Sequence, residues 1–554
     1  MLKSWGLTNF KSIYNADIDL APLTVLTGTN SSGKSSFIQS ILLIAQTMQN
    51  KFLDRSLVLN GDLIDLGQFD DIRSYSAPIS GHKYLPISFR WKFKSNGNVG
   101  KIESLLDNAN VAIATNKATA EEFFNENAEY LFDNLSEEYD FIEKEYLIQF
   151  DLEYNSFYDK DGCLEFDENR SRKGQLLPFI IGVKQKIFNS EGDDDRLSEI
   201  VAREICGKQL EEIDIFPEEK KYPILKVIDF SDRFSFEFYA QMYTRLFHFW
   251  PIRMIALCPD SLKLSKKNDK RISKNGYVSF NGNLYKACFL EFSNYFYNIK
   301  YLGPLRHHDS LYPFSKASDT KDVGLKGEYT AAVLDYYIDE KITYIPSLSI
   351  FCDIYNNNEK VEKTLNEALI DWLMYFDVAN EIKAEINKLG YELKANNINI
   401  YNVGTGVSQV LPVLVTCLLA EPNSTLIFEQ PELHLHPKVQ SRLADFFISM
   451  AFLGKQCIIE THSEYFIDKL RLRICQSLQN NNENIKNNTK IYYFEKVNLE
   501  TKIKEIKINE YGDYSEWPDG FFDEHHNNNE EILDVINKKK FNKNNDNSSG
   551  IPNE

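Results

Sequence analysis

Residues 28–35 read Gly-Thr-Asn-Ser-Ser-Gly-Lys-Ser, which is a complete G-x-x-x-x-G-K-S pattern. The apolar run 23–27 predicts a strand before this stretch, and the apolar spacing over 37–45 predicts a helix after it. A strand, a glycine loop and a helix in this order aim backbone N–H groups at phosphate oxygens. The stretch therefore predicts a phosphate-loop fold that binds a nucleoside triphosphate. The alternative, an ordinary glycine turn, is disfavoured by both flanks.

The loop itself supplies most of the expected phosphate and metal ligands. We expect Lys34 to reach the β- and γ-phosphates and the Ser35 hydroxyl to coordinate Mg²⁺. The other expected nucleotide-binding positions here are small or polar residues in or beside the loop: Asn30, Ser31, Ser32, Gly33 and Ser36.

Composition is that of a globular protein with more than one domain. The 554 residues, of which 43% are hydrophobic and 26% charged, are too many for one compact core. No apolar run approaches the roughly 20 residues that span a bilayer, and the first residues lack a signal-peptide core. The eight cysteines are scattered, unlike those of disulfide frameworks or zinc sites. We therefore expect a cytoplasmic protein without membrane contact.

The charge balance disfavours a surface built throughout for nucleic acid. The net charge is −19, from 62 basic and 81 acidic residues. The basic stretch 263–274 leaves a local DNA contact open, with a solvated loop as an equal alternative because aromatic residues do not interleave it.

Two buried-strand patterns in the C-terminal part end in polar residues. The apolar run 426–428 ends in Glu429, a candidate Mg²⁺ ligand, and the run 457–460 leads to Thr-His-Ser at 461–463. Because parallel strands place their carboxyl ends at one ligand-binding edge, His462 is a candidate sensor of the γ-phosphate. A lone histidine after a strand is more often structural, but the order of the motifs favours function.

Several motifs together resemble one family of proteins. Asn-Phe-Lys-Ser at 9–12, the phosphate loop, Glu-Gln-Pro-Glu-Leu-His-Leu-His-Pro at 429–437 and Thr-His-Ser at 461–463 resemble the prokaryotic AAA-type ATPases with an SMC/ABC-like head. That family includes the RecF-like repair ATPases and the ATPase domain of the overcoming-lysogenisation-defect (OLD) nucleases. The resemblance covers roughly the first 75 and the last 160 residues.

Three further stretches resemble a subfamily, some of whose members occur in anti-phage defence. They are Tyr-Leu-Gly-Pro-Leu-Arg at 301–306, Gly-Leu-Lys-Gly-Glu at 324–328 and a Trp-Pro-x-Gly-Phe-Phe signature at 517–522. Arg306 is a candidate phosphate ligand, and a surface ion pair is an equal alternative.

The resemblance implies an α/β fold, a P-loop NTPase of ABC/SMC-head type with a mixed sheet and helices. A large α+β insertion would separate the two halves of the head. The expected division is residues 1–80 for the N-terminal part of the head, 81–395 for the insertion, 396–526 for the C-terminal part and 527–554 for a flexible tail.

The same resemblance implies that two heads trap ATP and Mg²⁺ between them, as a homodimer or a higher homo-oligomer. Gly406 and Ser408, before an apolar helix, would then contact the γ-phosphate held by the other copy. A plain glycine turn capped by Ser408 is the alternative. Gln68 is a weaker candidate for a third Mg²⁺ ligand, beside Ser35 and Glu429.

One position departs from the pattern of the family. Members with efficient turnover carry a second acid after the Mg²⁺ acid, whereas this chain has Gln430. An amide cannot take a proton from water, and loss of a general base costs about 10²–10⁴-fold in rate. Glutamine orients water in some other phosphate-loop enzymes, and Glu432 is a substitute acid with a more ordinary structural role. The expected catalytic set is Lys34, Glu429, Gln430 and His462.

Several functions fit these features. The first is a slowly hydrolysing ATPase that dimerises around ATP and serves as sensor or switch for a separate effector, a nuclease or a toxin, in anti-phage defence. The second is a non-hydrolysing scaffold locked by ATP, and the third is a RecF-type repair ATPase. A built-in nuclease is disfavoured because Asp513, Glu516 and Asp519 lack a strand–helix scaffold around them.

Overall fold

A computed structural model describes both ends of the chain and part of its middle. Between residues 113 and 280 it describes only the backbone of strands. The other described ranges, with side chains except at 69–70, 93–94 and 405, are 1–50, 57–74, 87–94, 295–314, 321–347, 360–403, 405–479, 483–509, 511–515, 531–533 and 535–536.

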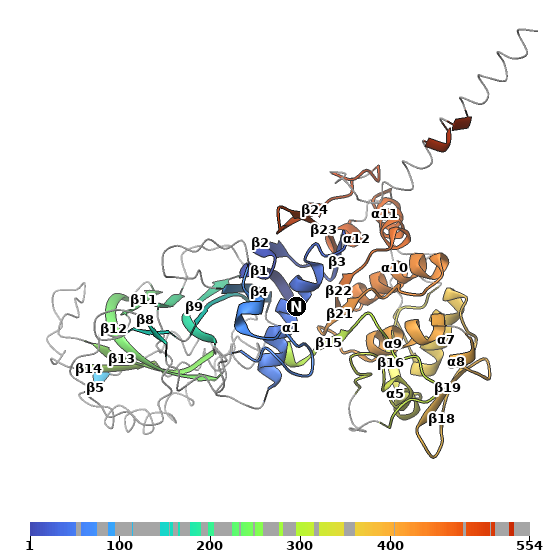
Figure 1. The fold of residues 1–554 in the computed structure, drawn as a ribbon, viewed down its shortest axis with the longest axis horizontal. Helices are drawn as coiled ribbons and strands as arrows, with labels where there is room; N and C mark the ends of the chain where they lie inside the picture. The colour runs from blue at the N-terminus through green and yellow to red at the C-terminus, as the bar shows by residue number, and fades with distance from the viewer. Residues whose placement is uncertain are drawn as a thin grey trace, which may run out of the picture.

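Six strands form the mixed sheet that carries the phosphate loop (Figure 1). Their order is β15 (Ile299–Leu302), β21 (Thr425–Glu429), β22 (Gln456–Glu460), β3 (Leu23–Gly28), β23 (Thr489–Val497) and β24 (Glu500–Ile506). The first five are parallel, and β24 turns back antiparallel from β23. The strands expected at 23–27, 426–429 and 457–460 are confirmed. Their near-complete burial is typical of a parallel sheet with helices on both faces.

Helices cover both faces of this sheet. On one face, Phe37 of α1 (Lys34–Gln49) meets Phe494 of β23, with ring centroids 6.0 Å apart. On the other, Phe447 of α10 (Pro437–Phe452) lies 5.4 Å from Phe428 of β21. The strand register places Glu429 one residue beyond Phe428, so its side chain points toward the α1 face.

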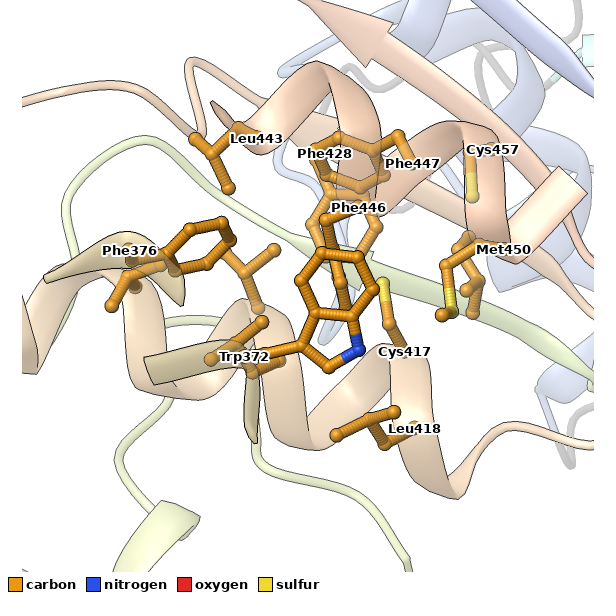
Figure 2. Close-up of a cluster of buried hydrophobic side chains, with 14 of the residues drawn as sticks. Trp372, Phe376, Cys417, Leu418, Phe428, Leu443, Phe446, Phe447, Met450 and Cys457 are labelled. Carbon is orange, nitrogen blue, oxygen red and sulfur yellow. The ribbon is translucent and has the colours of Figure 1, made fainter. Parts of the chain in front are cut away.

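A large apolar core lies on the α10 face (Figure 2). Trp372 and Phe376 of α7 (Leu365–Phe376) pack there beside Phe446, with 4.9 Å between the ring centroids of Trp372 and Phe446. Other helices that contribute to this core include α5 (Thr330–Tyr337), α9 (Thr405–Leu419) and α11 (Glu464–Gln479). Full burial of one such aromatic side chain contributes roughly 1.5–3 kcal/mol, so this core fixes the positions of α9, α10 and the strands they cover.

The N-terminal strands belong to a second, antiparallel sheet of eleven strands (Figure 1). Trp5 of β1 stacks on Trp91 of β4 at 5.4 Å, and its Nε1 donates to Ser40 Oγ of α1 at 2.8 Å, which ties this sheet to the head. The order is β2 (Ile13–Asp19), β1 (Leu2–Phe10), β4 (Ile87–Lys94), β6 (Lys144–Tyr154), β9 (Pro178–Asn189), β10 (Ser198–Arg203), β11 (Ile224–Ser231), β12 (Phe234–Phe247), β13 (Trp250–Cys258), β14 (Gly276–Phe280) and β5 (Ile113–Ala114).

Smaller elements complete the described parts. They are the pairs β7 (Ser156–Tyr158) with β8 (Leu164–Phe166) and β16 (Lys341–Tyr344) with β17 (Val361–Thr364), the sheet β18 (Ile382–Ile386), β19 (Tyr391–Ala395) and β20 (Ile398–Asn399), and the short helices η1 (Phe69–Ile72), α8 (Ile400–Val403) and α12 (Asn484–Asn487). Within the described ranges, no helix combines the length and the apolar character that crossing a membrane requires.

Strand pairing runs across both inner boundaries of the expected division. β1 pairs with β4, which joins the segment before residue 80 to the expected insertion. β15 lies inside the expected insertion, 81–395, yet it pairs with β21 in the head sheet. Hydrogen bonds between strands distant in sequence cause this difference, and the division into domains stays a prediction.

Candidate functional site

The phosphate loop has a backbone that only glycine permits at its two ends. Gly28 and Gly33 adopt φ of 136° and 104°. A Cβ on Gly28 would lie 2.1 Å from the Phe494 carbonyl oxygen, and one on Gly33 would lie 2.3 Å from Thr501 Oγ1. Gly33 is also the N-cap of α1 and makes no side-chain cap, so backbone N–H groups of the first helical turn face the loop.

Lys34 is folded over this loop and buried. Its Nζ donates to the carbonyl oxygens of Gly28 at 3.1 Å and Thr29 at 2.7 Å. Burial lowers the pKa of Lys34, and the negative charge of Glu460 opposes that shift. The ammonium therefore lies inside the loop, where a bound phosphate chain would offer it oxygens in place of these carbonyls.

Two carboxylates lie side by side at the ends of neighbouring strands. Glu429 and Glu460 are register partners in β21 and β22. The Ser35 hydroxyl donates to Glu460, at 3.0 Å to Oε2 and 3.3 Å to Oε1. The sequence predicts Glu429 as the acid that binds Mg²⁺ beside Ser35, and that role stays a prediction. In the sheet, β22 lies between β21 and the strand that carries the loop. Glu460 is therefore the nearer acid along the sheet.

Glu429 is held from the opposite side. The Tyr301 hydroxyl of β15 donates to Glu429 Oε1 at 3.0 Å. Burial, and then the neighbouring charge of Glu460, raises the pKa of Glu429 to about 7, while the Tyr301 bond opposes the shift. Burial also raises the pKa of Glu460, against the opposing charge of Lys34. The site thus concentrates negative charge that a cation would neutralise.

Gln430 follows in a left-handed backbone conformation. Its φ is 44°, and its N–H donates to the Glu460 carbonyl oxygen at 2.8 Å. Arg306 donates to the carbonyl oxygens of Glu429 at 3.1 Å and Gln430 at 3.3 Å. Arg306 is 7% exposed, so the expectation of a surface ion pair is wrong. Burial lowers the pKa of Arg306 to about 10, and the charge of Glu432 opposes this.

His462 lies beside the phosphate loop, and its role as a sensor of the γ-phosphate stays a prediction. Burial, and then the charge of Lys34, lowers the pKa of its half-buried ring, and the backbone of Gly28 opposes the shift. The backbone N–H of His462 donates to Glu432 Oε1 at 2.8 Å. Glu432 is buried and accepts this bond, and the choice between a structural role and that of a substitute acid stays a prediction.

The remaining predicted ligands differ in how far they are exposed to solvent. Asn30 and Ser31 are exposed on the loop, Ser32 is buried, and Ser36 is partly buried in the first turn of α1. Gln68 is exposed beside η1, where its N–H donates to Asp71 Oδ2 at 2.7 Å. Its role as a metal ligand stays a prediction.

The segment expected to contact a second copy is helical earlier than the sequence indicated. α9 begins at Thr405, so Gly406 and Ser408 lie within its first turn instead of in a preceding loop. Ser408 is 1% exposed, and a Cβ on Gly406 would lie 3.9 Å from Leu435 Cδ2. Their contact with another copy stays a prediction. The basic stretch 263–274 and the signature 517–522 lie outside the described residues.

Three contributors to the site were missed at the sequence level. Glu460 ends an apolar run just as Glu429 does, so the same pattern could have indicated it. Tyr301 and Thr501 reach the site only through the fold. Thr501 Oγ1 donates to the Ser32 carbonyl oxygen at 2.8 Å and lies 2.8 Å from Ser12 Oγ, which supports the loop from behind.

The residues present fit a magnesium ion bound together with phosphate. Ser35 and Glu429 offer the oxygen ligands that Mg²⁺ prefers, and Glu460 lies beside both of them. Mg²⁺ commonly uses one or two carboxylates plus substrate phosphates. Across the part of the chain that the structure describes, no group of three or more His, Cys, Asp or Glu side chains surrounds a metal position. In sites with one or two carboxylates, substrate phosphates and water complete the coordination of Mg²⁺.

The parallel strands, the glycine loop and the side chains at the strand ends define a phosphate-loop NTPase. Family models agree at the level of sequence. One described as "AAA ATPase domain" matches residues 1–228, and one described as "AAA domain, putative AbiEii toxin, Type IV TA system" matches 358–468. A third, "Protein of unknown function (DUF3696)", matches 486–532. No curated protein matches the chain.

Solved SMC heads overlap most of the chain at low identity. The SMC head domain from Thermotoga maritima is 10% identical and covers 92% of this chain and 99% of its own, with a TM-score of 0.32. An SMC head bound to the C-terminal winged-helix domain of ScpA is 10% identical, covers 92% and 98%, and has a TM-score of 0.36. An Smc head with an extended coiled coil, bound to the C-terminal domain of ScpA derived from Pyrococcus furiosus, is 10% identical, covers 91% and 96%, and has a TM-score of 0.31.

Proposed function

We propose that this chain is an ATP-dependent switch. Two copies bind ATP and Mg²⁺ at their phosphate loops, close around the nucleotide, hydrolyse it slowly and control a separate effector protein. The observation that carries the proposal is the gathering of complementary side chains at the carboxyl edge of the parallel strands: Lys34, Ser35, Glu429, Glu460 and His462.

The chemistry of these groups suits phosphoryl transfer. Catalysis of this reaction is mainly positioning and electrostatic stabilisation. Lys34 would exchange the Gly28 and Thr29 carbonyls for phosphate oxygens, and His462 would contact the terminal phosphate beside it. Mg²⁺, when bound, would neutralise charge on the phosphate oxygens. Gln430 would orient the attacking water without taking its proton, which supports slow turnover.

An effector in defence against phage is the part of the proposal that rests on family likeness. The family model that matches residues 358–468 is described as a putative AbiEii toxin of a type IV toxin–antitoxin system. That description concerns a toxin system, so we infer a nuclease or toxin as the effector of this switch.

A second candidate is a scaffold that ATP locks without hydrolysis. Gln430 in place of an acid favours it, as does the restraint on that residue by Arg306 and the Glu460 backbone. A locked scaffold would bind ATP and dimerise but would not turn over.

Steady-state ATP hydrolysis separates the two candidates. Lys34→Ala serves as the blank, and Lys438→Ala, which removes an exposed lysine paired with Asp377, serves as the matched control. Turnover above the Lys34→Ala blank supports the switch. ATP binding with turnover equal to the blank supports the scaffold, and no ATP binding by the unaltered chain contradicts both.

The dimer is tested by mass. Light scattering of the chain with ATP and Mg²⁺ should give twice the mass found without nucleotide, and Lys34→Ala should abolish that change. A mass independent of nucleotide would contradict closure around ATP.

A further inference from the structure

The orientation of the Ser35 hydroxyl is decided by Glu460. A serine hydroxyl has one proton to donate and two lone pairs to offer. Ser35 gives its proton to the Glu460 carboxylate, at 3.0 Å to Oε2 and 3.3 Å to Oε1. With the proton turned to Glu460, the lone pairs of the oxygen are left to face a cation.

The fold fixes Glu460 in the position from which it accepts the Ser35 hydroxyl. It is the last residue of β22, it is 3% exposed, and its backbone carbonyl accepts the Gln430 N–H. β22 lies directly beside β3, whose end is the phosphate loop. Glu460 is therefore a rigid acceptor aimed at the first turn of α1.

Glu429 cannot replace this contact in the geometry observed. Its strand, β21, lies one position farther from β3, and its carboxylate accepts the Tyr301 hydroxyl from β15 at 3.0 Å. The two acids are thus engaged from opposite sides, Glu460 by Ser35 and Glu429 by Tyr301.

We propose that Glu460 is the positioning residue of the metal site, holding the Ser35 hydroxyl so that its oxygen faces Mg²⁺. The inference deepens the proposed function and rests on nucleotide binding at this loop. A partner that orients a metal ligand typically contributes 10–100-fold to metal affinity. The negative charge of Glu460 adds to the attraction because the site is buried.

The test is the Mg²⁺ concentration needed for half-maximal binding of a fluorescent ATP analogue. Glu460→Gln keeps the shape of the side chain, removes the charge, and allows its NH₂ group to turn the Ser35 proton away. We expect it to raise the required Mg²⁺ concentration by about 10–100-fold. In chelator, the affinity of Glu460→Gln for the same analogue should differ less than about twofold from that of the unaltered chain. A collapsed loop would lower this affinity as well.

A double-mutant cycle shows whether Glu460 acts through Ser35. Ser35→Ala should raise the Mg²⁺ requirement similarly, and adding Glu460→Gln to it should raise the requirement by much less than Glu460→Gln does in the unaltered chain, because only the effect of the lost charge remains. The matched control is Asp371→Asn, because Asp371 makes the same kind of bond, 2.9 Å from the Ser347 hydroxyl, away from the loop. It should leave the Mg²⁺ requirement unchanged.

The outcomes separate this inference from the proposed function. Normal nucleotide binding with an unchanged Mg²⁺ requirement in Glu460→Gln would overturn the inference alone. Independent, additive effects of the two substitutions would also overturn it. Failure of the unaltered chain to bind the analogue would overturn the proposed function and the inference with it.

Discussion

Two buried polar clusters in this molecule use charge in opposite ways. One lies at the strand ends, where Glu429 and Glu460 are neighbours and meet the hydroxyls of Tyr301 and Ser35. The other lies among α7, α10 and α11, where Asp445 accepts from Arg473 at 2.6 and 3.2 Å and from the Tyr375 hydroxyl at 2.6 Å.

In the helix cluster the carboxylate has cationic side chains as partners, whereas in the strand-end cluster the carboxylates have hydroxyl groups as partners. Asp445 is fully buried and has two cations near it, Arg473 and Lys469, the latter at 3.6 Å. At the strand ends two acids face hydroxyl donors, while Lys34 donates to backbone carbonyls of its own loop. Removing one partner of the first arrangement would leave a buried charge unpaired, whereas the second arrangement holds negative charge that a bound cation would neutralise.

The largest effect should follow from breaking the helix cluster. Asp445→Ala leaves Arg473 buried without its carboxylate, which typically destabilises by 3–5 kcal/mol. Denaturant unfolding monitored by circular dichroism measures this free energy. Lys438→Ala, which breaks an exposed pair with Asp377, should leave the midpoint unchanged. Equal losses in the two variants would mean that the Asp445 cluster is not specially stabilising.

The strand-end cluster should respond with the opposite sign. Glu429→Gln removes one of two adjacent acids and keeps an acceptor for Tyr301. Without metal or nucleotide at pH 7.5, we expect a gain of about 1–3 kcal/mol in the free energy of unfolding. The same denaturant experiment, in chelator, measures it. A loss of stability would show that the acid is structural, as Asp445 is.

The sequence predicted the parts of this contrast that lie in continuous patterns. The loop at 28–35 and the apolar runs ending at Glu429 and Glu460 led to the parallel sheet, because each pattern is local and its burial is encoded in its own residues. His462 was placed correctly beside the loop because parallel strands share one carboxyl edge.

What the sequence could not predict depends on pairing between distant segments. Tyr301 reaches Glu429 only because β15 joins the far side of β21, across more than 120 residues of chain. Arg306 is buried for the same reason. Helix α9 begins earlier than expected, and Ser408 in its first turn is buried, a tertiary environment that local helix propensity does not encode.

A third buried charge, Lys455, gives an intermediate case that pH can reveal. Its Nζ donates to the carbonyl oxygens of Cys417 at 2.7 Å and Leu418 at 3.3 Å. Burial lowers its pKa to about 8, below the value near 10.5 of the unfolded chain. Between pH 8 and 10.5 the unfolded chain holds the extra proton, so stability contributed by this group rises with pH.

Lys455→Met removes that titration and isolates it. The unaltered chain loses a buried charge between pH 7 and pH 10, and the variant has no such charge to lose. We therefore expect the free energy of unfolding to rise over this range by about 1–3 kcal/mol more in the unaltered chain than in the variant. Urea unfolding at both pH values measures the difference. Parallel pH profiles would show that the two carbonyls compensate the ammonium fully.

The smallest effect concerns the neutral support of the strand-end cluster. Thr501 holds the Ser32 carbonyl and meets Ser12, so Thr501→Val should leave a buried carbonyl without its donor and loosen the loop around Lys34. We expect nucleotide affinity to fall by roughly fivefold, about 1 kcal/mol, while Thr501→Ser, which keeps the hydroxyl, should retain it. Titration calorimetry with ADP compares the two. If both variants bind ADP equally well, the Thr501 hydroxyl does not contribute to the shape of the loop. The strand-end cluster would then depend on its charged groups alone.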